Sequence, residues 1–503
     1  MDERSASSQY MTNLHALVVG LAREGTALAR FLALRGARVT VTDIQPAEAL
    51  VDGVDALSGL PVSLALGGHP VALLDSADMV FVSPGVPLEI PFLVEARRRG
   101  LPLSSETRLF TRLCPAPVVG ITGSSGKTTT TAMVGDMLKS AGWRTWVGGN
   151  IGRPLIGLVD EISTTDLVVM ELSSFQLEFF APWPQGGQGR GATHLNSVLL
   201  DPAGWSPSIA AVLNITPNHL DRHATIESYT AAKMHILNYQ GPGDIAVLNL
   251  DNPVTRRIGE EAASRGQRVL WFSLEQAVEE GAFLQGEDLT LRLAGREEVL
   301  CGVKDLKLLG RHNLANSLAA GVLAASVSLI RRSQVESMAL LIEALRQTLI
   351  SFPGLDHRLE LVRDWGGIRW YNDSIATTPE RTVAALRAFD APIVLLAGGR
   401  DKHLSWDAMA ALTWRKVRHL ILFGEAAALI ERAMCEAQHT APTMARGTEI
   451  SHAGTLQQAV ELAARLAQPG DVVLLSPGGT SFDAYRDFVA RGDHFRQLVR
   501  ALE

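Results

Sequence analysis

The chain of 503 residues is 47% hydrophobic and 20% charged, a balance typical of folded globular proteins rather than disordered or fibrous ones. Its length exceeds what one ordinary core requires and predicts two to four domains. The 46 basic and 53 acidic residues give a formal net charge of −7 with no basic tract, which argues against nucleic acid as a partner.

The amino-terminal stretch, MDERSASSQYMTN, is polar and lacks the apolar core of a secretory signal. The three cysteines, Cys114, Cys301 and Cys435, are far apart and odd in number, which indicates incidental thiols in a reducing compartment. Residues 314–330 form the most apolar helical stretch, but they include an asparagine and three serines and are short for a membrane span. We therefore expect a cytoplasmic protein with no membrane partner.

The first predicted domain covers residues 1–114. Residues 15–43 read as an apolar strand, a glycine turn, an amphipathic helix and a second strand that ends in an acid. A further strand is expected near 77–87, and the sequence CPAP then breaks the pattern. These elements predict a Rossmann-like domain.

The turn after the first strand, GLAREG, resembles a dinucleotide-binding fingerprint. Gly20, Ala22 and Gly25 fit the spacing G-x-[G/A]-x-x-G, and Asp43 follows the second strand. The pattern predicts a diphosphate-bearing ligand on this domain. It also leaves open a nicotinamide-dependent oxidoreductase, which would bind NAD here and would have no use for Lys127.

A phosphate-binding loop opens the second predicted domain, residues 115–351. The segment GSSGKTT places Gly123, Gly126, Lys127 and Thr128 between an apolar strand and a helix. Small residues let backbone N–H groups face a phosphate, the lysine would neutralise it, and the threonine hydroxyl suits Mg²⁺. The match is imperfect, because an isoleucine stands in place of the first glycine of the eight-residue pattern.

Two further strands of this domain end in polar residues. The strand at 166–174 ends in Glu171, and the strand at 209–216 leads into His219. Because the carboxyl ends of parallel strands meet at one edge of a sheet, both side chains are expected near the phosphate loop, where they could ligate a metal. Lys233 lies fourteen residues after His219 on a predicted helix, and spacing alone predicts that it is a surface lysine.

The stretch 181–207 is rich in glycine and proline without a period and predicts a long surface loop. The third predicted domain, residues 352–503, alternates strands and helices again. Three of its strand ends carry polar loops, which include Asp373, Lys402 and Ser481, and they predict a rim that could hold an anionic small molecule. The fold class expected is α/β with mostly parallel sheets: a Rossmann-like domain, a central P-loop ATPase-like domain and a second Rossmann-like domain.

Ten motifs that occur in order along the chain resemble those of the Mur ligases, which form amide bonds at the expense of ATP in peptidoglycan precursor synthesis. The motifs are GITGSSGKTTT, GGNIG, ELSSFQLE, LNITPNHLDRH, AAKMHIL, GRHNLANSLAA, DHRLE, NDSIATTP, AGGRDK and SPGGTSFDAYRDFVARGDHF. The resemblance covers roughly residues 15–500 and is strongest to the glutamate-adding members. It implies a monomeric enzyme that joins D-glutamate to UDP-N-acetylmuramoyl-L-alanine with ATP and two Mg²⁺ ions, and it implies no NAD.

The resemblance also implies roles for the matching positions. Lys127, Glu171, His219 and Lys233 would be catalytic; Thr128 and the last three of these would serve the metal ions, Lys233 as a CO₂-derived carbamate. The implied ATP-binding positions are Gly123, Ser124, Ser125, Gly126, Lys127, Thr128, Thr129, Asn313, Asn316, Arg358 and Asp373. The implied substrate-binding positions are Gly20, Arg23, Glu24, Gly25, Asp43, Ser83, Pro84, Gly85, Asn150, Ser173, His357, Lys402, Ser481 and Phe482.

The chain departs from the family pattern at three places. The pattern NDSKAT has a lysine, near the carboxylate of the amino acid, where this chain has Ile375; SPGGTS replaces SPACAS; and Asn218 replaces an aspartate. The preference for D- or L-glutamate therefore stays open, as do a ligase for another amino acid and a non-catalytic relative. The intact Lys127 and Lys233 argue against loss of catalysis.

Overall fold

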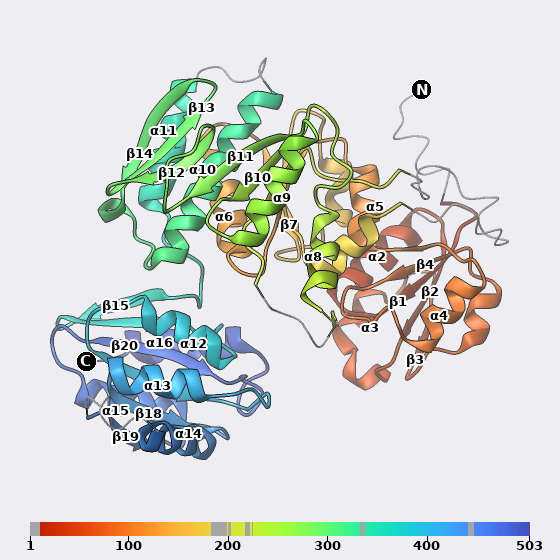
Figure 1. The fold of residues 1–503 in the computed structure, drawn as a ribbon. Helices are drawn as coiled ribbons and strands as arrows, with labels where there is room; N and C mark the ends of the chain where they lie inside the picture. Colours follow the sequence, from red (N-terminus) through yellow and green to blue (C-terminus); the bar gives the residue numbers. More distant parts are fainter. Residues whose placement is uncertain are drawn as a thin grey trace. The chain divides into compact units, whose positions relative to one another are not determined.

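The computed structural model describes residues 11–182, 199, 203–216, 222–223, 225–331, 338–440 and 447–502. It forms two compact units, one of residues 1–303 with 315–350 and the other of residues 304–314 with 351–503. Three sheets flanked by helices make up the two units and confirm the predicted α/β class (Figure 1). The predicted domain boundaries stay predictions.

The amino-terminal sheet of the first unit has the order β3-β2-β1-β4-β5, and all its strands are parallel. Its strands are β1 (His15–Val19), β2 (Arg38–Asp43), β3 (Val62–Leu66), β4 (Met79–Val82) and β5 (Leu103–Ser104). Alternate residues of β1 enter two different buried clusters, because helices cover both faces of the sheet. The glycine turn follows β1, between its neighbours β2 and β4, at a switch point where ligands bind in such sheets.

The central sheet of the first unit has nine strands in the order β14-β13-β12-β11-β10-β9-β6-β8-β7. Its strands are β6 (Val118–Thr122), β7 (Thr145–Gly149), β8 (Leu167–Glu171), β9 (Ile209–Val212), β10 (Ile245–Asn249), β11 (Arg268–Ser273), β12 (Gly281–Gln285), β13 (Asp288–Leu293) and β14 (Arg296–Gly302). The last three strands form an antiparallel extension that the sequence analysis did not predict. β6 lies between β8 and β9, so the phosphate loop also occupies a switch point.

The helices of this part of the chain are α2 (Arg23–Leu34), α3 (Val51–Ala56), α4 (Pro91–Arg98), α5 (Glu106–Leu113), α6 (Lys127–Ser140), α7 (Ser174–Leu177), α8 (Ile226–Met234), α9 (Pro253–Ser264), α10 (Arg311–Ile330) and α11 (Met338–Ser351). Most of them connect parallel strands, whereas α10 and α11 follow the antiparallel extension. Among the described residues, α10 alone is long and apolar enough to cross a membrane, but 78% of its most apolar window is buried. Most of the loop expected at 181–207 lies outside the described residues.

The second unit contains a six-stranded sheet with the order β15-β16-β20-β17-β18-β19, in which only the edge pair β15–β16 is antiparallel. The strands are β15 (Glu360–Trp365), β16 (Ile368–Asn372), β17 (Ile393–Gly398), β18 (Val417–Phe423), β19 (Glu449–His452) and β20 (Val472–Gly478). The helices are α12 (Pro379–Arg387), α13 (Asp407–Lys416), α14 (Ala427–Thr440), α15 (Leu456–Leu466) and α16 (Phe488–Arg500). Alternate residues of β17 enter two buried clusters, so both faces of this sheet are covered as well.

Candidate active site

The phosphate loop (residues 123–129) joins β6 to the amino terminus of α6. Gly126 precedes the helix with φ +84°, a conformation that favours glycine. A Cβ atom at this position would lie 2.2 Å from Asn316 Oδ1, so the loop and α10 approach closely there. Thr128 is half-buried and Thr129 is buried in the first turn of α6. The loop thus presents the N–H end of a 14-residue helix, which is suited to an anion.

Two residues that the sequence analysis did not single out hold this loop. Asn214, just after β9, accepts a hydrogen bond from Ser125 N (2.9 Å) through Oδ1 and donates to Ser125 O (3.2 Å) through Nδ2. Tyr229 on α8 donates from its hydroxyl to Ser124 Oγ at 3.2 Å. Lys127 Nζ donates to Gly123 O at 2.9 Å, so its ammonium lies against the loop. The local sequence carries no signal for these partners, because they come from other strands and helices.

Glu171 ends β8, beside β6, and is 2% exposed. Its Oε1 accepts a hydrogen bond from Asn150 Nδ2 at 2.8 Å, and Asn150 N donates to Glu171 O at 2.8 Å. Its Oε2 is buried and receives no hydrogen bond from the described residues. The strands β7 and β8 approach so closely at their ends that position 149 requires glycine, because a Cβ there would lie 2.2 Å from Glu171 O. The structure therefore brings Glu171 and Asn150 together and leaves one buried carboxylate oxygen of Glu171 without a hydrogen bond from the described residues.

Lys233 is 1% exposed, so the surface position that spacing alone predicted is wrong. Its Nζ donates to Thr122 Oγ1 at 3.1 Å, at the end of β6, and lies 4.7 Å from the centre of the Tyr229 ring. Burial lowers the pKa of Lys233 well below its ordinary value, the charge of Lys127 lowers it further, and Glu171 opposes the shift. The buried amine is thus close enough to the phosphate loop and to Glu171 to feel both charges.

His219, the remaining predicted metal ligand, lies outside the described residues, as does Asn218. Among the residues that the structure describes, no three His, Cys, Asp or Glu side chains gather as a metal-binding group. His223, which follows, is buried, and its Nε2 lies 3.0 Å from Ser174 Oγ. His223 therefore has a packing role beside α7.

The glycine turn (residues 20–25) is tightly built. Gly20 has φ +99°, and a Cβ there would lie 2.9 Å from Ser83 Oγ. Ser83 Oγ donates to Gly20 O at 2.9 Å, and so the end of β4 is tied to the turn. Both carboxylate oxygens of Asp43 accept backbone hydrogen bonds, from Leu21 N at 2.7 Å and from Gln45 N at 2.9 Å. The structure thus brings Gly20, Ser83 and Asp43 together at one edge of the sheet.

Two residues of α2 reach the central part of the first unit. Arg23 Nη2 donates to Asn150 O at 3.2 Å. Glu24 is buried, and its Oε1 accepts from Gln176 Nε2 at 3.0 Å. Burial and the neighbouring Glu106 raise the pKa of Glu24 to about 8. Gln176 also forms the capping box of α7 with Ser173, so Glu24 contacts the helix that follows Glu171 rather than solvent.

In the second unit, Asp373 follows β16 and is 5% exposed. Its Oδ2 accepts a hydrogen bond from Ser476 Oγ at 2.8 Å, and its Oδ1 accepts from Leu359 N at 3.3 Å. Burial raises the pKa of Asp373 to about 7, although these hydrogen bonds and the charges of Arg358 and Arg381 oppose the shift. The carboxyl group is thus held by β20, through Ser476, and by the residue just before β15, Leu359.

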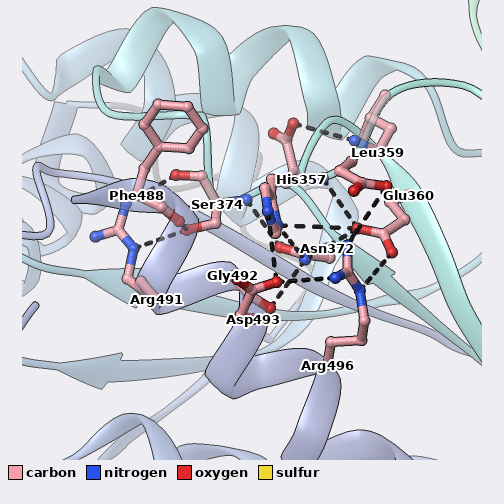
Figure 2. Close-up of polar contacts among 12 residues, drawn as sticks. His357, Leu359, Glu360, Asn372, Ser374, Phe488, Arg491, Gly492, Asp493 and Arg496 are labelled. Carbon is pink, nitrogen blue, oxygen red and sulfur yellow. Dashed lines mark hydrogen bonds and ion pairs between the residues drawn. The ribbon is translucent and has the colours of Figure 1, made fainter.

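His357 and Asn372 are buried and form a polar cluster with the half-buried Glu360 (Figure 2). Asn372 Nδ2 lies 3.0 Å from His357 Nδ1 and 3.2 Å from Glu360 Oε2. Arg496 pairs with both oxygens of Glu360, at 2.8 and 3.0 Å. A Cβ at Gly492 would lie 2.2 Å from His357 Nδ1, so a glycine is needed where α16 passes the imidazole. His357 is thus fixed in orientation before any ligand arrives.

Arg491, which the sequence analysis did not single out, is fully buried in the same unit. Its guanidinium donates to Ser374 Oγ (3.0 Å) and Ser374 O (2.9 Å) (Figure 2). It also donates to Gly479 O (3.2 Å). It therefore ties together the loops after β16 and β20.

The other predicted residues of the second unit lie at its loops. Ser481 is buried, whereas Lys402 is exposed and Phe482 is 60% exposed. Ile375 is half-buried, and Arg381 Nη1 donates to its carbonyl oxygen at 2.9 Å.

Of the remaining predicted ATP-binding positions, Asn313 belongs to the second unit and Asn316 to the first. Asn313 is buried, and its Nδ2 donates to Leu309 O at 2.8 Å. Arg358 is half-buried.

The loop between β4 and α4 contains the last two predicted positions, Pro84 and Gly85. Gly85 O accepts a hydrogen bond from Arg222 Nη1 at 3.3 Å.

Comparison with known families assigns each part of the chain to the same group of enzymes. Residues 14–105 match "Mur ligase MurD-like, N-terminal domain", residues 121–182 and 191–324 match "Mur ligase middle domain", and residues 357–479 match "Mur ligase, glutamate ligase domain".

Similar proteins cover nearly the whole chain. The UDP-N-acetylmuramoylalanine--D-glutamate ligase of Symbiobacterium thermophilum is 42% identical over 489 residues, which are 97% of this chain and 98% of the relative. The ligase of the same name from Geotalea uraniireducens is 40% identical over 493 residues, 98% of each chain. Among solved structures, MurF ligase from Thermotoga maritima in complex with ADP covers 98% of this chain and 99% of its own, with a TM-score of 0.52 at 17% identity, a likeness of fold.

Proposed function

The chain belongs to the Mur ligase family, and from this membership we propose that it joins D-glutamate to UDP-N-acetylmuramoyl-L-alanine in an ATP-dependent step of peptidoglycan precursor synthesis. The observation that carries the proposal within the structure is the cluster at the carboxyl ends of β6 and β8. There the phosphate loop, the buried carboxylate of Glu171 and the buried amine of Lys233 share one edge of the sheet.

The reaction forms an amide in two steps. The terminal carboxylate of the alanyl substrate attacks the γ-phosphorus of ATP, so that ADP leaves and an acyl phosphate forms. The amino group of D-glutamate then attacks the acyl carbonyl and loses a proton, and inorganic phosphate leaves. The protein has to hold three anionic substrates in line, and we assign the phosphates of ATP to Lys127 and to the N–H groups at the start of α6. Because water would hydrolyse the acyl phosphate, the site must exclude it.

The residues at this edge fit Mg²⁺, which prefers carboxylate and hydroxyl oxygens. Glu171 supplies a buried carboxylate oxygen that receives no hydrogen bond from the described residues, and Thr128 supplies a hydroxyl in the first turn of α6. With His219, these residues would hold the ion. Bound there, Mg²⁺ supplies positive charge against the phosphate groups.

Lys233 would complete the metal-binding set as a carbamate. Its burial and lowered pKa favour the neutral amine, which is the form that adds to CO₂. The carbamate oxygens are ligands of the kind that a second Mg²⁺ prefers.

The second unit would bind D-glutamate and contribute to the ATP site. We assign the amino acid to Lys402, Ser481 and Phe482, at loops that follow β17 and β20. Ile375 leaves the site without the lysine of the common pattern. Arg381, which donates to the carbonyl oxygen of Ile375, places another positive group beside that position.

Phosphate release tests the proposal. With ATP, Mg²⁺ and UDP-N-acetylmuramoyl-L-alanine present, phosphate should appear on addition of D-glutamate, and Lys127→Ala should abolish it. A nicotinamide-dependent oxidoreductase would instead form NADH and would be indifferent to Lys127→Ala. Phosphate release that does not depend on D-glutamate would contradict the proposal.

A further inference from the structure

The turn after β4, residues 83–86, receives hydrogen bonds from a residue far along the chain. Arg222 Nη1 donates to Gly85 O and Arg222 Nη2 donates to Val86 O, each at 3.3 Å. The guanidinium therefore spans two consecutive carbonyl groups. This turn contains Ser83, which is bonded to the glycine turn, so it belongs to the edge of the sheet proposed to bind the UDP part of the substrate.

The other side of the same guanidinium is held by α7. The Arg222 Cζ atom lies 4.4 Å from the centre of the Phe175 ring, a cation–π distance. The next residue, His223, stacks on Phe175 with ring centres 5.5 Å apart and an interplanar angle of 7°, and it reaches Ser174 Oγ at 3.0 Å. Arg222 and His223 thus both contact α7, through the ring of Phe175 and the hydroxyl group of Ser174.

The placement of α7 gives this contact a consequence for the reaction. α7 begins three residues after Glu171, at the end of β8 where the phosphoryl-transfer groups gather. We propose that Arg222 is a positioning residue that fixes the turn of residues 83–86 against α7 and so sets the affinity for the UDP-bearing substrate. This inference rests on the proposed function.

The contact between the turn and α7 depends on the planar guanidinium group of arginine. Two N–H groups held in one plane can meet two consecutive carbonyls while the flat face rests on a ring, and a lysine ammonium cannot do both. Arg97 on α4 donates to Leu88 O at 2.9 Å and so supports the chain just after this turn.

Steady-state kinetics of Arg222→Lys and Arg222→Met test the inference. Both variants should raise KM for the UDP-bearing substrate about 10-fold, while kcat and KM for ATP stay within about twofold of wild type. Arg346→Met is the matched control, because Arg346 also donates twice to a backbone carbonyl, Val299 O, at 2.9 and 2.8 Å, away from this turn. A wild-type KM in Arg222→Lys, or equal losses in kcat and in both KM values, would overturn the inference.

A second measurement does not depend on turnover. Amide hydrogen exchange of Gly85, Val86 and Leu88 in the ligand-free enzyme should be faster in both Arg222 variants than in wild type or in Arg346→Met. Calorimetric binding of UDP-N-acetylmuramoyl-L-alanine should weaken by the same factor as KM. If wild type forms no product, the proposed function fails, and exchange together with calorimetry still decides the role of Arg222; unchanged exchange and affinity would refute it.

Discussion

Lys233 is only 1% exposed, and its amine donates a hydrogen bond to Thr122 Oγ1. If its amine is needed as a carbamate, Lys233→Met should lower kcat by at least about 100-fold, the scale of losing one group that stabilises the transition state. The fold should tolerate the change, because methionine is apolar and Thr122 keeps its own bond to Leu172 O. Lys139→Met, on an exposed side of α6, is the control.

The carbamate itself has a separate readout. The wild-type rate in buffer freed of CO₂ should rise when bicarbonate is added. A rate that does not change on addition of bicarbonate, together with an active Lys233→Met enzyme, would contradict a catalytic role for the carbamate.

Asp373 should make the stability of the second unit depend on pH. Burial raises its pKa to about 7, against about 3.9 in an unfolded chain, so between these values the folded protein binds a proton that the unfolded chain lacks. The resulting stabilisation is complete below about pH 4 and is lost as pH rises through about 7. Asp373→Asn cannot bind this proton. Its unfolding temperature, relative to wild type, should therefore be higher at pH 8 than at pH 5, by about 2–4 °C for each kcal/mol; a pH-independent difference would contradict this.

Arg381 should affect the KM for the amino acid more than the KM for the nucleotide. Because it lies beside Ile375, where the common pattern has a lysine, Arg381→Met should raise KM for D-glutamate by about 10-fold, as for one charge-assisted hydrogen bond. KM for ATP should stay near wild type. Arg387→Met, at the other end of α12, serves as control, and equal effects of the two variants would argue against the role.

Single residues were predictable where local sequence encodes them. The glycines and lysine of the phosphate loop and the acid at the end of β8 follow from motif and strand pattern. The burial of Lys233 does not, because it depends on packing against β6 and Tyr229, distant in sequence. The same reason hides Asn214 and Arg491, which hold loops from other elements.

At the scale of elements, the two ends of α6 offer a matched pair of glycines. Gly126→Ala should lower the free energy of unfolding for two reasons. The left-handed backbone costs about 1–2 kcal/mol for a residue with a Cβ, and that Cβ would clash with Asn316 Oδ1. Gly142 also has a positive φ, +88°, but no atom lies within 4 Å of the added Cβ, so Gly142→Ala should meet only the backbone cost.

The two glycine variants should therefore separate in ATP binding. KM for ATP should rise by about 10-fold or more in Gly126→Ala, the equivalent of at least about 1.4 kcal/mol, and stay near wild type in Gly142→Ala. Equal KM values in both variants would mean that the loop geometry does not matter for ATP.

The antiparallel extension β12–β14 shows a sequence signal that was present but not used. Residues 288–293, DLTLRL, alternate apolar and polar side chains, and the two-residue turn Ala294-Gly295 has positive φ at both positions. That combination is typical of a β-hairpin. The parallel strands were easier to predict, because their continuous apolar runs end in glycine or acid.

For the whole molecule, alternation of strands and helices predicted three α/β sheets, and the structure confirms them. The sequence pattern did not predict the order of the strands in each sheet, because that order depends on which strands distant in sequence pair with each other. The expected cytoplasmic location and monomeric state stay predictions. Nearly full-length relatives and a matching family for each part of the chain place D-glutamate addition at the centre of the account.

The most direct test of that claim is to identify the product by mass spectrometry after incubation with ATP, Mg²⁺, UDP-N-acetylmuramoyl-L-alanine and either D- or L-glutamate. We expect one glutamyl residue to be added from D-glutamate and not from L-glutamate, with one ADP formed for each product. Addition from L-glutamate alone, or no addition from either, would contradict the account.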